Sequence, residues 1–208
     1  MWLSVLTAVL VGYLLGNLNG AVCVSAMMKD DVREHGSGNA GLTNFIRNYG
    51  AGRASFVILI DAGKAVLACL TGGLLLAPYG YYVEGAAIGG VAVMLGHDFP
   101  ALLGFKGGKG ILSGLFIAVM VDWRIALLIL AVFATVYLLT QYVSLASVLA
   151  ATTFGIAFAV LHIGNPVVLA CGLFMGALTV FMHRGNIARL LKGQERKTNL
   201  FGKGENSK

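Results

Sequence analysis

The chain has 208 residues, of which 58% are hydrophobic and only 12% are charged, and its mean hydropathy is +0.83. Water-soluble domains carry about 25% charged residues, so this composition excludes an ordinary soluble domain and indicates an integral membrane protein. A net charge of +6 would suggest nucleic acid binding in a soluble protein. In a membrane protein the basic residues set topology and contact anionic lipid, so we expect membrane lipid and no nucleic acid as a partner.

Seven apolar segments follow one another along the chain, separated by short polar turns. No charged residue precedes Lys29, and none lies between Arg124 and His183, a stretch long enough for more than two transmembrane helices of about 20 residues. We therefore predict an all-α, polytopic membrane fold with about seven transmembrane helices, at residues 2–24, 54–76, 83–99, 108–122, 125–140, 145–161 and 167–182. The segment at 108–122 is the weakest, because only Ile111 to Val121 is cleanly apolar, and we expect a short or broken helix there.

The apolar segments indicate a single domain. We expect residues 1–200 to form one integral-membrane domain and the polar, Gly-rich residues 201–208 to form a disordered cytoplasmic tail. The first segment has no basic n-region and is long enough to span, so we expect a transmembrane helix and not a cleaved signal peptide. The three cysteines lie in apolar segments, which favours packing over a disulfide framework or a metal site. We expect no metal and no cofactor.

The basic residues are distributed unevenly among the loops. Thirteen of the 15 Lys and Arg residues lie in or directly beside alternate loops, at 29–53, 97–107, 141–144 and 183–208. The positive-inside rule then places these loops and the C-terminus in the cytoplasm and the N-terminus outside. Every Gly-rich or multi-polar loop falls on the same side, which indicates that the functional residues gather there.

The first of these loops, HGSGNAGLTNFIRNYG from residue 35 to 50, combines glycines with short hydrogen-bond donors and one arginine. The candidate ligands for an anion are Ser37, Asn39, Thr43, Asn44 and Arg47, with Gly38 keeping the backbone exposed. If a short helix begins near Leu42, its N-terminal N–H groups and positive dipole end would point at a bound anion. The alternative is a solvated turn that is rich in Asn and Gly.

Polar residues within the spans need partners, since unpaired charges in hydrocarbon are costly. Asp61 and Lys64 are three residues apart in the second segment, and a mutual ion pair is the simplest arrangement, with a proton or ion relay as the alternative. Asn17 and Asn19 lie late in the first segment, where they would either bond to another helix or line a polar cavity.

The loop GHDFPALLGFKGGKG, from residue 96 to 110, lies between apolar segments and yet carries several glycines and two lysines. Successive glycines allow backbone N–H groups to turn toward an anion, and a nearby lysine adds a point charge. The alternative is a flexible turn with basic flanks. The nucleotide P-loop pattern is not met, because Leu103 occupies its first glycine position and Gly110 replaces its Ser or Thr.

The last candidate residues lie at the start of the sixth predicted span and in the C-terminal segment. Ser144, in YVSLAS, would either donate to an anion or cap its helix. In the segment HRGNIARLLKGQERK, His183 and Asn186 are three residues apart and share one helical face at the membrane boundary. The basic residues from Lys192 onward are better explained by contact with anionic lipid.

These stretches, taken in their order and spacing, resemble the bacterial acyl-phosphate:glycerol-3-phosphate acyltransferases of the PlsY type. The resemblance covers residues 16–197 and rests on GSGNAGLTNFIRNYG, GHDFPALLGFKGGKG, YVSLAS and HRGNIARLLKGQERK, with Asp61 and Lys64 similar to the family's second span. The chain departs from the family pattern at Leu42, at Met182 and at residues 16–21, but none of these departures removes a charged or donor residue of the three main motifs.

The resemblance implies transfer of a fatty acyl group from acyl phosphate to the sn-1 hydroxyl of glycerol 3-phosphate, giving lysophosphatidic acid and phosphate. It also implies a multi-pass protein of the bacterial plasma (inner) membrane with its active site facing the cytoplasm. We predict His183, Asn186 and Lys109 as catalytic residues. The predicted substrate and phosphate ligands are Ser37, Gly38, Asn39, Thr43, Asn44, Arg47, Lys106, Gly107, Gly108, Gly110 and Ser144. The sequence leaves the oligomeric state open, with a monomer as the simplest form.

A different class of function also fits part of the pattern. A small transporter or flippase for an anionic solute would use broken helices and intramembrane charges. Against it, the polar motifs lie on one side only and no internal repeat is evident. A purely structural membrane subunit would not need three donor-rich loops on one side.

Overall fold

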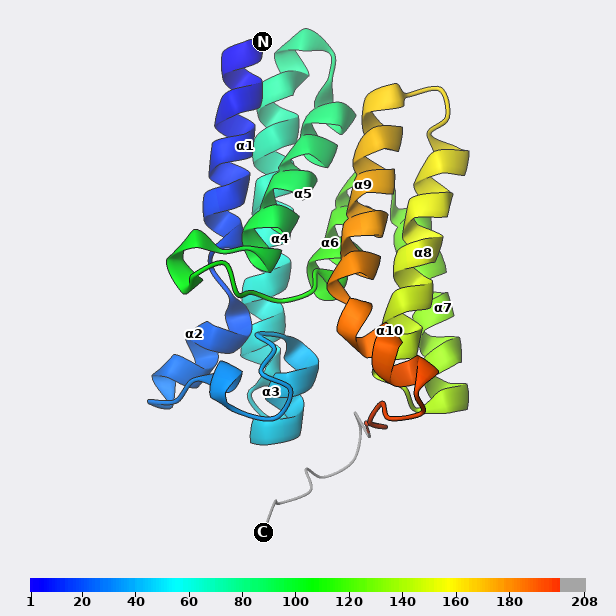
Figure 1. Ribbon diagram of the computed structural model, residues 1–208. Coiled ribbons are helices and arrows are strands. Elements are labelled where there is room, and N and C mark those ends of the chain that lie inside the picture. Colours follow the sequence, from blue (N-terminus) through cyan, green and yellow to red (C-terminus); the bar gives the residue numbers. More distant parts are fainter. Residues whose placement is uncertain (199–208) are drawn as a thin grey trace.

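The computed structural model describes residues 1–198, and in this part of the chain the secondary structure is all helical, as predicted (Figure 1). The long helices are α1 (Trp2–Gly16), α4 (Ala54–Leu76), α5 (Tyr82–Asp98), α6 (Ile111–Val121), α7 (Trp123–Thr140), α8 (Val143–Leu161) and α9 (Pro166–Met182). The short helices are α2 (Gly20–Met27), α3 (Leu42–Tyr49) and α10 (Arg184–Leu191), with 3-10 turns η1 (Val32–Glu34), η2 (Ala77–Tyr79) and η3 (Ala101–Leu103). The predicted tail at 201–208 lies outside the described residues.

By helix length and composition the structure supports five or six candidate spans, and the count of seven stays a prediction. Each of the seven apolar segments forms a helix, but five helical stretches within residues 1–198 are long and apolar enough to cross a membrane: 2–27, 54–79, 82–103, 123–140 and 143–161. A sixth span arises if α9 and α10, which meet at a bend of 54°, are counted as one broken span. Helix α6 has only 11 residues, about 17 Å of helix against a hydrocarbon core of about 30 Å.

Helices α1, α4 and α5 form one group, held together by glycines at their contacts (Figure 1). A Cβ atom on Gly72 would lie 2.0 Å from the carbonyl oxygen of Gly85, and one on Gly16 would lie 2.4 Å from that of Val93. Side chains at these positions would push the helices apart. Small residues at helix contacts are the usual means of close packing within membranes, and here they explain the high glycine content.

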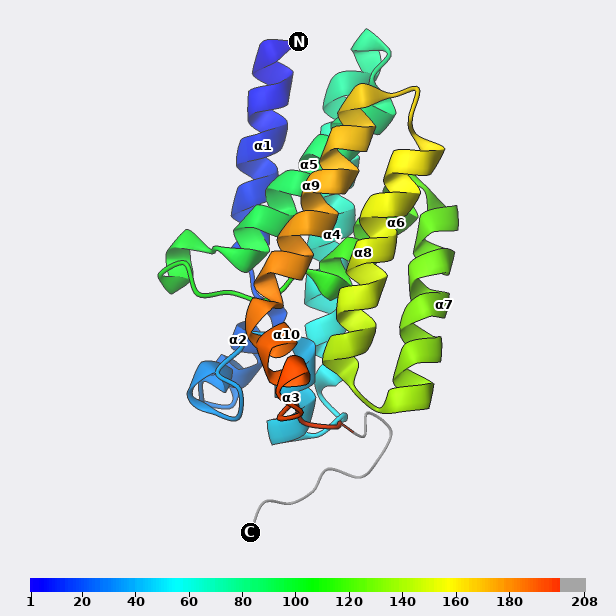
Figure 2. The ribbon, with the colours of Figure 1, turned by 45° about the vertical axis from the view of Figure 1, so that its right-hand side comes forward.

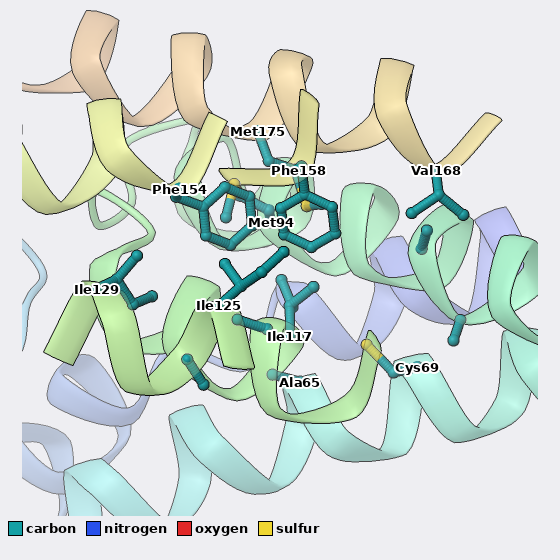
Figure 3. Packing of buried hydrophobic residues seen from close by; sticks show 14 of the residues in the cluster. Ala65, Cys69, Met94, Ile117, Ile125, Ile129, Phe154, Phe158, Val168 and Met175 are labelled. Carbon is teal, nitrogen blue, oxygen red and sulfur yellow. The ribbon is translucent and has the colours of Figure 1, made fainter. Parts of the chain in front are cut away.

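Helices α7, α8 and α9 form the second group, and α6 connects it to the first through contacts with α4, α5 and α7 (Figure 2). The core between the groups is apolar and tightly packed. The Phe154 and Phe158 rings of α8 lie 4.7 Å apart, centroid to centroid, and Figure 3 shows them beside Met94, Ile117, Ile125 and Met175. This core closes the inner end of the cavity described below.

Turn residues set where the helices begin. Asp122 caps α7 by accepting a hydrogen bond from the backbone N–H of Arg124, and Asn165 caps α9 by accepting one from Val168, with Pro166 at the first helical position. Both patterns are common helix starts. Helices α2, α3 and α10 lie at the opposite end of the bundle, and the loop from residue 99 to 110 crosses it nearer mid-height, between α5 and α6 (Figure 1). The predicted polar motifs therefore lie in the half of the bundle that ends at α3 and α10.

The two charged residues of α4 pair as predicted. The Nζ atom of Lys64 lies 2.8 Å from Oδ1 of Asp61, and both side chains are almost fully buried. The two asparagines of the first span tie loops to the bundle: Asn17 accepts a hydrogen bond from the N–H of Leu102, and Asn19 donates one to the carbonyl oxygen of Ala40. The polar end of the bundle is thus fastened to α1 by side chains.

Candidate active site

A cavity of about 420 Å³ is lined at its polar end by residues of α3 and α10, which both lie at the same end of the bundle (Figure 2). Its inner part is apolar, with walls from α6, α7, α8 and α9 that include Leu115, Ile129, Phe133, Ala151, Phe154 and Gly176. Its mouth is polar, and it brings together most of the predicted site residues: Ser37, Asn39, Thr43, Asn44, Arg47, Lys109, Gly110, Ser144, His183 and Asn186. A cavity with an apolar interior and a cationic mouth suits an amphiphilic anion.

Asn44 organises the first loop and does not point freely at a ligand, in contrast to its predicted role. Its side-chain amide donates to the carbonyl oxygens of Val32, His35 and Asn39 at 3.0–3.1 Å, and its Oδ1 accepts from the backbone N–H of Ser37. The side chain is buried. With these partners Asn44 has little capacity left for a phosphate, so it fixes the loop that carries Ser37 and Asn39.

Arg47 reaches the cavity from α3, as predicted, but it is held there by the chain's own C-terminal segment. Its Nε donates to Oγ1 of Thr198 at 2.9 Å, and a terminal nitrogen also contacts this hydroxyl and the carbonyl oxygen of Arg196. Burial lowers the pKa of the Arg47 guanidinium, but an arginine stays charged at any physiological pH. An anion would have to replace the Thr198 hydroxyl to bind this cation fully.

The glycine-rich loop uses the N–H groups of Gly107 and Gly108 internally, so their role as phosphate ligands stays a prediction. The N–H of Gly107 donates to the carbonyl oxygen of Asp98 at 3.2 Å, and that of Gly108 donates to the carbonyl oxygen of His97 at 3.0 Å. Neither residue lines the cavity. Gly110 does line it, with a φ of +75° that favours glycine, and it is the N-cap of α6. The first N–H groups of α6 therefore face the mouth without helical partners.

The two lysines of this loop occupy different environments. Lys106 is exposed and does not line the cavity, so the structure does not place it with the predicted ligands. Lys109 is partly buried at the mouth and donates to Oδ1 of Asn186. Burial, followed by the nearby charge of Arg189, lowers the pKa of Lys109 to about 8. A cation that is partly desolvated and close to other cations gains most from binding an anion.

His183 lies at the bend between α9 and α10, with its ring oriented by the backbone. Its Nδ1 is 2.8 Å from the carbonyl oxygen of Thr179. A carbonyl oxygen can only accept, so Nδ1 carries the proton and, in the neutral ring, Nε2 carries the lone pair. Nε2 can therefore accept a hydrogen bond from a hydroxyl group in the cavity. Asn186 lies on the same side, as the three-residue spacing predicted.

Ser144 is buried at the start of α8, lines the cavity and has no hydrogen-bond partner for its Oγ within the described residues. A buried hydroxyl without a partner costs free energy unless a ligand or water satisfies it. This position fits the predicted role as a donor to an anion better than a helix cap, because α8 has no side-chain cap at its N-terminus.

The sequence did not point to Arg189, Glu195 or Thr198; Arg189 and Glu195 line the cavity, and Thr198 contacts Arg47 beside it. Glu195 is buried, accepts from Nδ2 of Asn186 at 2.9 Å and pairs with Nε of Arg189 at 2.7 Å. Thr198 is also buried and donates its backbone N–H to the carbonyl oxygen of Gln141. Residues 189–198 had been explained by lipid contact or left unassigned. The single acidic residue within that basic run was the signal that could have identified Glu195.

Comparison with known proteins identifies the family of the chain. The profile of the family described as glycerol-3-phosphate acyltransferase matches residues 6–193. A glycerol-3-phosphate acyltransferase of Thermoanaerobacter pseudethanolicus is 39% identical over 195 residues, which cover 93% of this chain and 95% of that protein. One of Clostridioides difficile is 38% identical over 196 residues, which cover 93% of this chain and 95% of that protein.

Solved structures show the same fold. A crystal structure of PlsY, an integral membrane glycerol 3-phosphate acyltransferase, in its glycerol 3-phosphate form has a TM-score of 0.83 at 33% identity and covers 96% of this chain and 100% of that one. The lysophosphatidic acid form of PlsY has a TM-score of 0.80 at 33% identity, with 95% of this chain and 96% of that one covered.

Proposed function

The chain belongs to the glycerol-3-phosphate acyltransferase family, and we propose that it transfers a fatty acyl group from acyl phosphate to the sn-1 hydroxyl of glycerol 3-phosphate. The products are 1-acyl-glycerol 3-phosphate, which is a lysophosphatidic acid, and inorganic phosphate. The observation that carries the proposal is the convergence of Arg47, Lys109 and His183, from three distant parts of the chain, on the mouth of one apolar cavity.

The cavity matches the two substrates in polarity. An acyl phosphate has an apolar tail and an anionic head, and the walls around Phe133 and Phe154 would take the tail. Lys109, the first turn of α6 and Ser144 would hold its phosphate, since helix N-termini and lysines favour phosphate binding. Arg47 would take the phosphate of the acceptor, in exchange for its contact with Thr198.

The reaction needs no covalent intermediate on the enzyme. The sn-1 oxygen attacks the carbonyl carbon of the acyl phosphate, and the bond from this carbon to the phosphate oxygen breaks, with its electron pair leaving on phosphate. The hydroxyl proton passes either to Nε2 of His183 or to the departing phosphate, while Asn186 orients the reacting groups. Acyl phosphate is already activated, so positioning and neutralisation of charge supply most of the catalysis.

Incubation of purified protein with acyl phosphate and labelled glycerol 3-phosphate tests the proposal directly. Labelled lysophosphatidic acid and an equal amount of released phosphate would support it. The same protein in sealed vesicles tests the transporter alternative, which predicts labelled solute inside the vesicles without lipid formation. Lipid formation with acyl-CoA but none with acyl phosphate would contradict the proposed donor.

The protein is a multi-pass integral membrane protein, and we propose that it lies in the bacterial inner membrane with its active site facing the cytoplasm. The basic loops lie at the same end of the bundle as the active site, and the positive-inside rule places such loops in the cytoplasm. Gly52 and Gly164 lie at opposite ends of the bundle, and a side chain at either would meet no atom within 4 Å. In a variant with the native cysteines replaced by alanine, we expect Gly164→Cys to react with an impermeant thiol reagent in spheroplasts. We expect Gly52→Cys to react only after permeabilisation, and the reverse pattern would contradict the orientation.

The pKa of Lys109, which burial lowers to about 8, predicts a fall in activity at high pH. Lys109 is charged below this pH and becomes neutral above it, so kcat/KM should fall as the pH rises through about 8, since this ratio reports the free enzyme. The substrate phosphate is already doubly ionised there, with a pKa near 6. In the matched variant Lys109→Arg the charge persists, so the fall should move to higher pH. An unchanged profile would show that another group causes it.

A further inference from the structure

A second buried polar cluster borders the cavity and has no part in the mechanism above. It joins α4 to the end of α5 and consists of Asp61, Lys64 and His97, each at most 5% exposed. The ammonium of Lys64 lies 2.8 Å from Oδ1 of Asp61 and 2.7 Å from Nδ1 of His97, and it donates to the carbonyl oxygen of Leu18 at 2.6 Å. Asp61 and His97 both line the cavity.

These contacts determine which nitrogen of His97 carries the proton. An ammonium group has three donors and no acceptor, so Nδ1 of His97 must accept its hydrogen bond from Lys64. A ring that accepts at Nδ1 is neutral and carries its proton on Nε2. The three donors of Lys64 are all used, by Asp61, His97 and Leu18, which holds the ring in this tautomer.

The protonated nitrogen of His97 lies against the glycine-rich loop. A Cβ atom on Gly108 would lie 2.0 Å from Nε2, so the ring edge packs directly on the backbone of Gly108, the residue before Lys109. Within residues 1–198 the protein offers no hydrogen-bond acceptor to this Nε2, although the side chain is 95% buried. Because His97 lines the cavity, this donor can be satisfied there by water or by a ligand.

We propose that His97 is a further substrate-binding residue, which donates its Nε2–H to the phosphate held beside Lys109, and that Lys64 is a positioning residue which fixes this tautomer. The inference rests on the proposed function for the identity of the anion. The loop has few free donors for the phosphate, because the N–H groups of Gly107 and Gly108 are used in backbone hydrogen bonds. The imidazole provides a donor at the same point.

The tautomer can be measured in the wild-type protein, with a substitution needed only to assign the signal. We expect ¹⁵N spectra of histidine-labelled protein in nanodiscs to show His97 with Nδ1 unprotonated and Nε2 protonated, with its signal assigned by its loss in His97→Gln. Adding inorganic phosphate, the leaving group held beside Lys109, or acetyl phosphate as a second probe, should shift the Nε2 proton. The signal of His162, at the other end of the bundle, is the control and should not move. A proton on Nδ1, or no response to either anion in active protein, would overturn the proposal.

Kinetics separate binding from structural support. His97→Leu removes the donor and should lower kcat/KM by about ten- to a hundredfold, the value of one hydrogen bond to a charged group. His97→Gln keeps an N–H donor and should retain most of the activity. Equal losses in both variants, with unchanged folding, would count against a donor role.

Lys64 is tested with its partner, because a single substitution would leave an unpaired buried charge. The double variant Asp61→Asn/Lys64→Met contains no charge at these positions and should fold. We expect it to lose the strict Nε2–H tautomer and to raise KM more than it lowers kcat. An unchanged tautomer and KM would remove Lys64 from the proposal.

If wild-type protein formed no lipid but its His97 signal still responded to phosphate, the acyltransferase function would fail and the anion site would stand.

Discussion

Replacement of His183 by alanine should lower the maximal rate of acyl transfer by about 10²–10⁴-fold, whether the residue takes the proton or orients the acceptor hydroxyl for attack. The Nδ1 proton of this residue is held by the carbonyl oxygen of Thr179, so its Nε2 faces the cavity as an acceptor. Alanine removes both the possible base and the group that positions the acceptor hydroxyl. The loss should appear in kcat, because the phosphate contacts of both substrates remain.

The variant His183→Gln separates the two roles. Glutamine can still form a hydrogen bond but cannot take a proton at these pH values. If His183 is the base, the alanine and glutamine variants should lose similar, large factors, and the fall in rate at low pH should vanish in both. If it only positions the hydroxyl and the departing phosphate takes the proton, His183→Gln should keep far more activity than His183→Ala. We expect the second result, since phosphate is already an acceptor at the reacting centre.

The measurement is the maximal rate at saturating substrates from about pH 3.5 to 8.5, because burial lowers the pKa of His183 to about 4 and the fall at low pH should lie there. His162→Gln is the matched control, because His162 lies at the other end of the bundle beside Asp122. That variant should stay near wild-type activity. Near-wild-type activity in His183→Ala would remove this residue from both roles and leave the reacting centre elsewhere in the cavity.

Hydropathy and charge predicted the frame of this fold well, because each depends on local sequence. The apolar segments became helices, and the short α6 corresponds to the one segment whose apolar part ran only from Ile111 to Val121. The three-residue spacing of Asp61 and Lys64 predicted their ion pair. The count of full spans stays a prediction, because helix length as well as apolar character decides whether a segment crosses the membrane, and the structure supports five or six.

The detailed roles at the mouth could not be read from local sequence. Gly107 and Gly108 look like phosphate ligands until the carbonyl oxygens of Asp98 and His97 are found to use their N–H groups. Asn44 looks like a free donor until the loop is folded around it. These contacts depend on how the backbone closes in three dimensions, which composition does not specify.

The contact of His97 with the buried pair of Asp61 and Lys64 could not be predicted from local sequence either. His97 is 33 residues from Lys64 in sequence, and only the packing of α5 on α4 brings its ring to the ammonium. The contact between Arg47 and Thr198, which are 151 residues apart, is of the same kind. Sequence alone could name the charged groups near the site but could not say which of them meet.

Replacement of Lys109 by alanine should lower kcat/KM by about ten- to a hundredfold, the loss of one charge-assisted contact to phosphate at about 1.5–3 kcal/mol. Lys109 stands at the mouth, next to the first turn of α6, and its only side-chain hydrogen bond within residues 1–198 is to Asn186. Arg47→Ala should cost a similar factor, because its guanidinium reaches the same mouth from α3. Each variant should remain folded, since neither side chain belongs to the apolar core.

Lys106→Ala is the matched control for this prediction. Lys106 lies three residues before Lys109 in the same loop, but it is exposed and does not line the cavity. Its removal should change kcat/KM by less than about twofold, within the usual range for exposed positions. The double variant adds a second distinction: if Lys109 and Arg47 bind different phosphates, their losses in free energy should add, whereas a shared phosphate should make them non-additive. Near-full activity of both single variants would show that the anions bind away from this mouth, because a cation placed against phosphate cannot be removed without loss of binding energy. An equal loss in Lys106→Ala would show that the effect is not specific to the cations of the mouth.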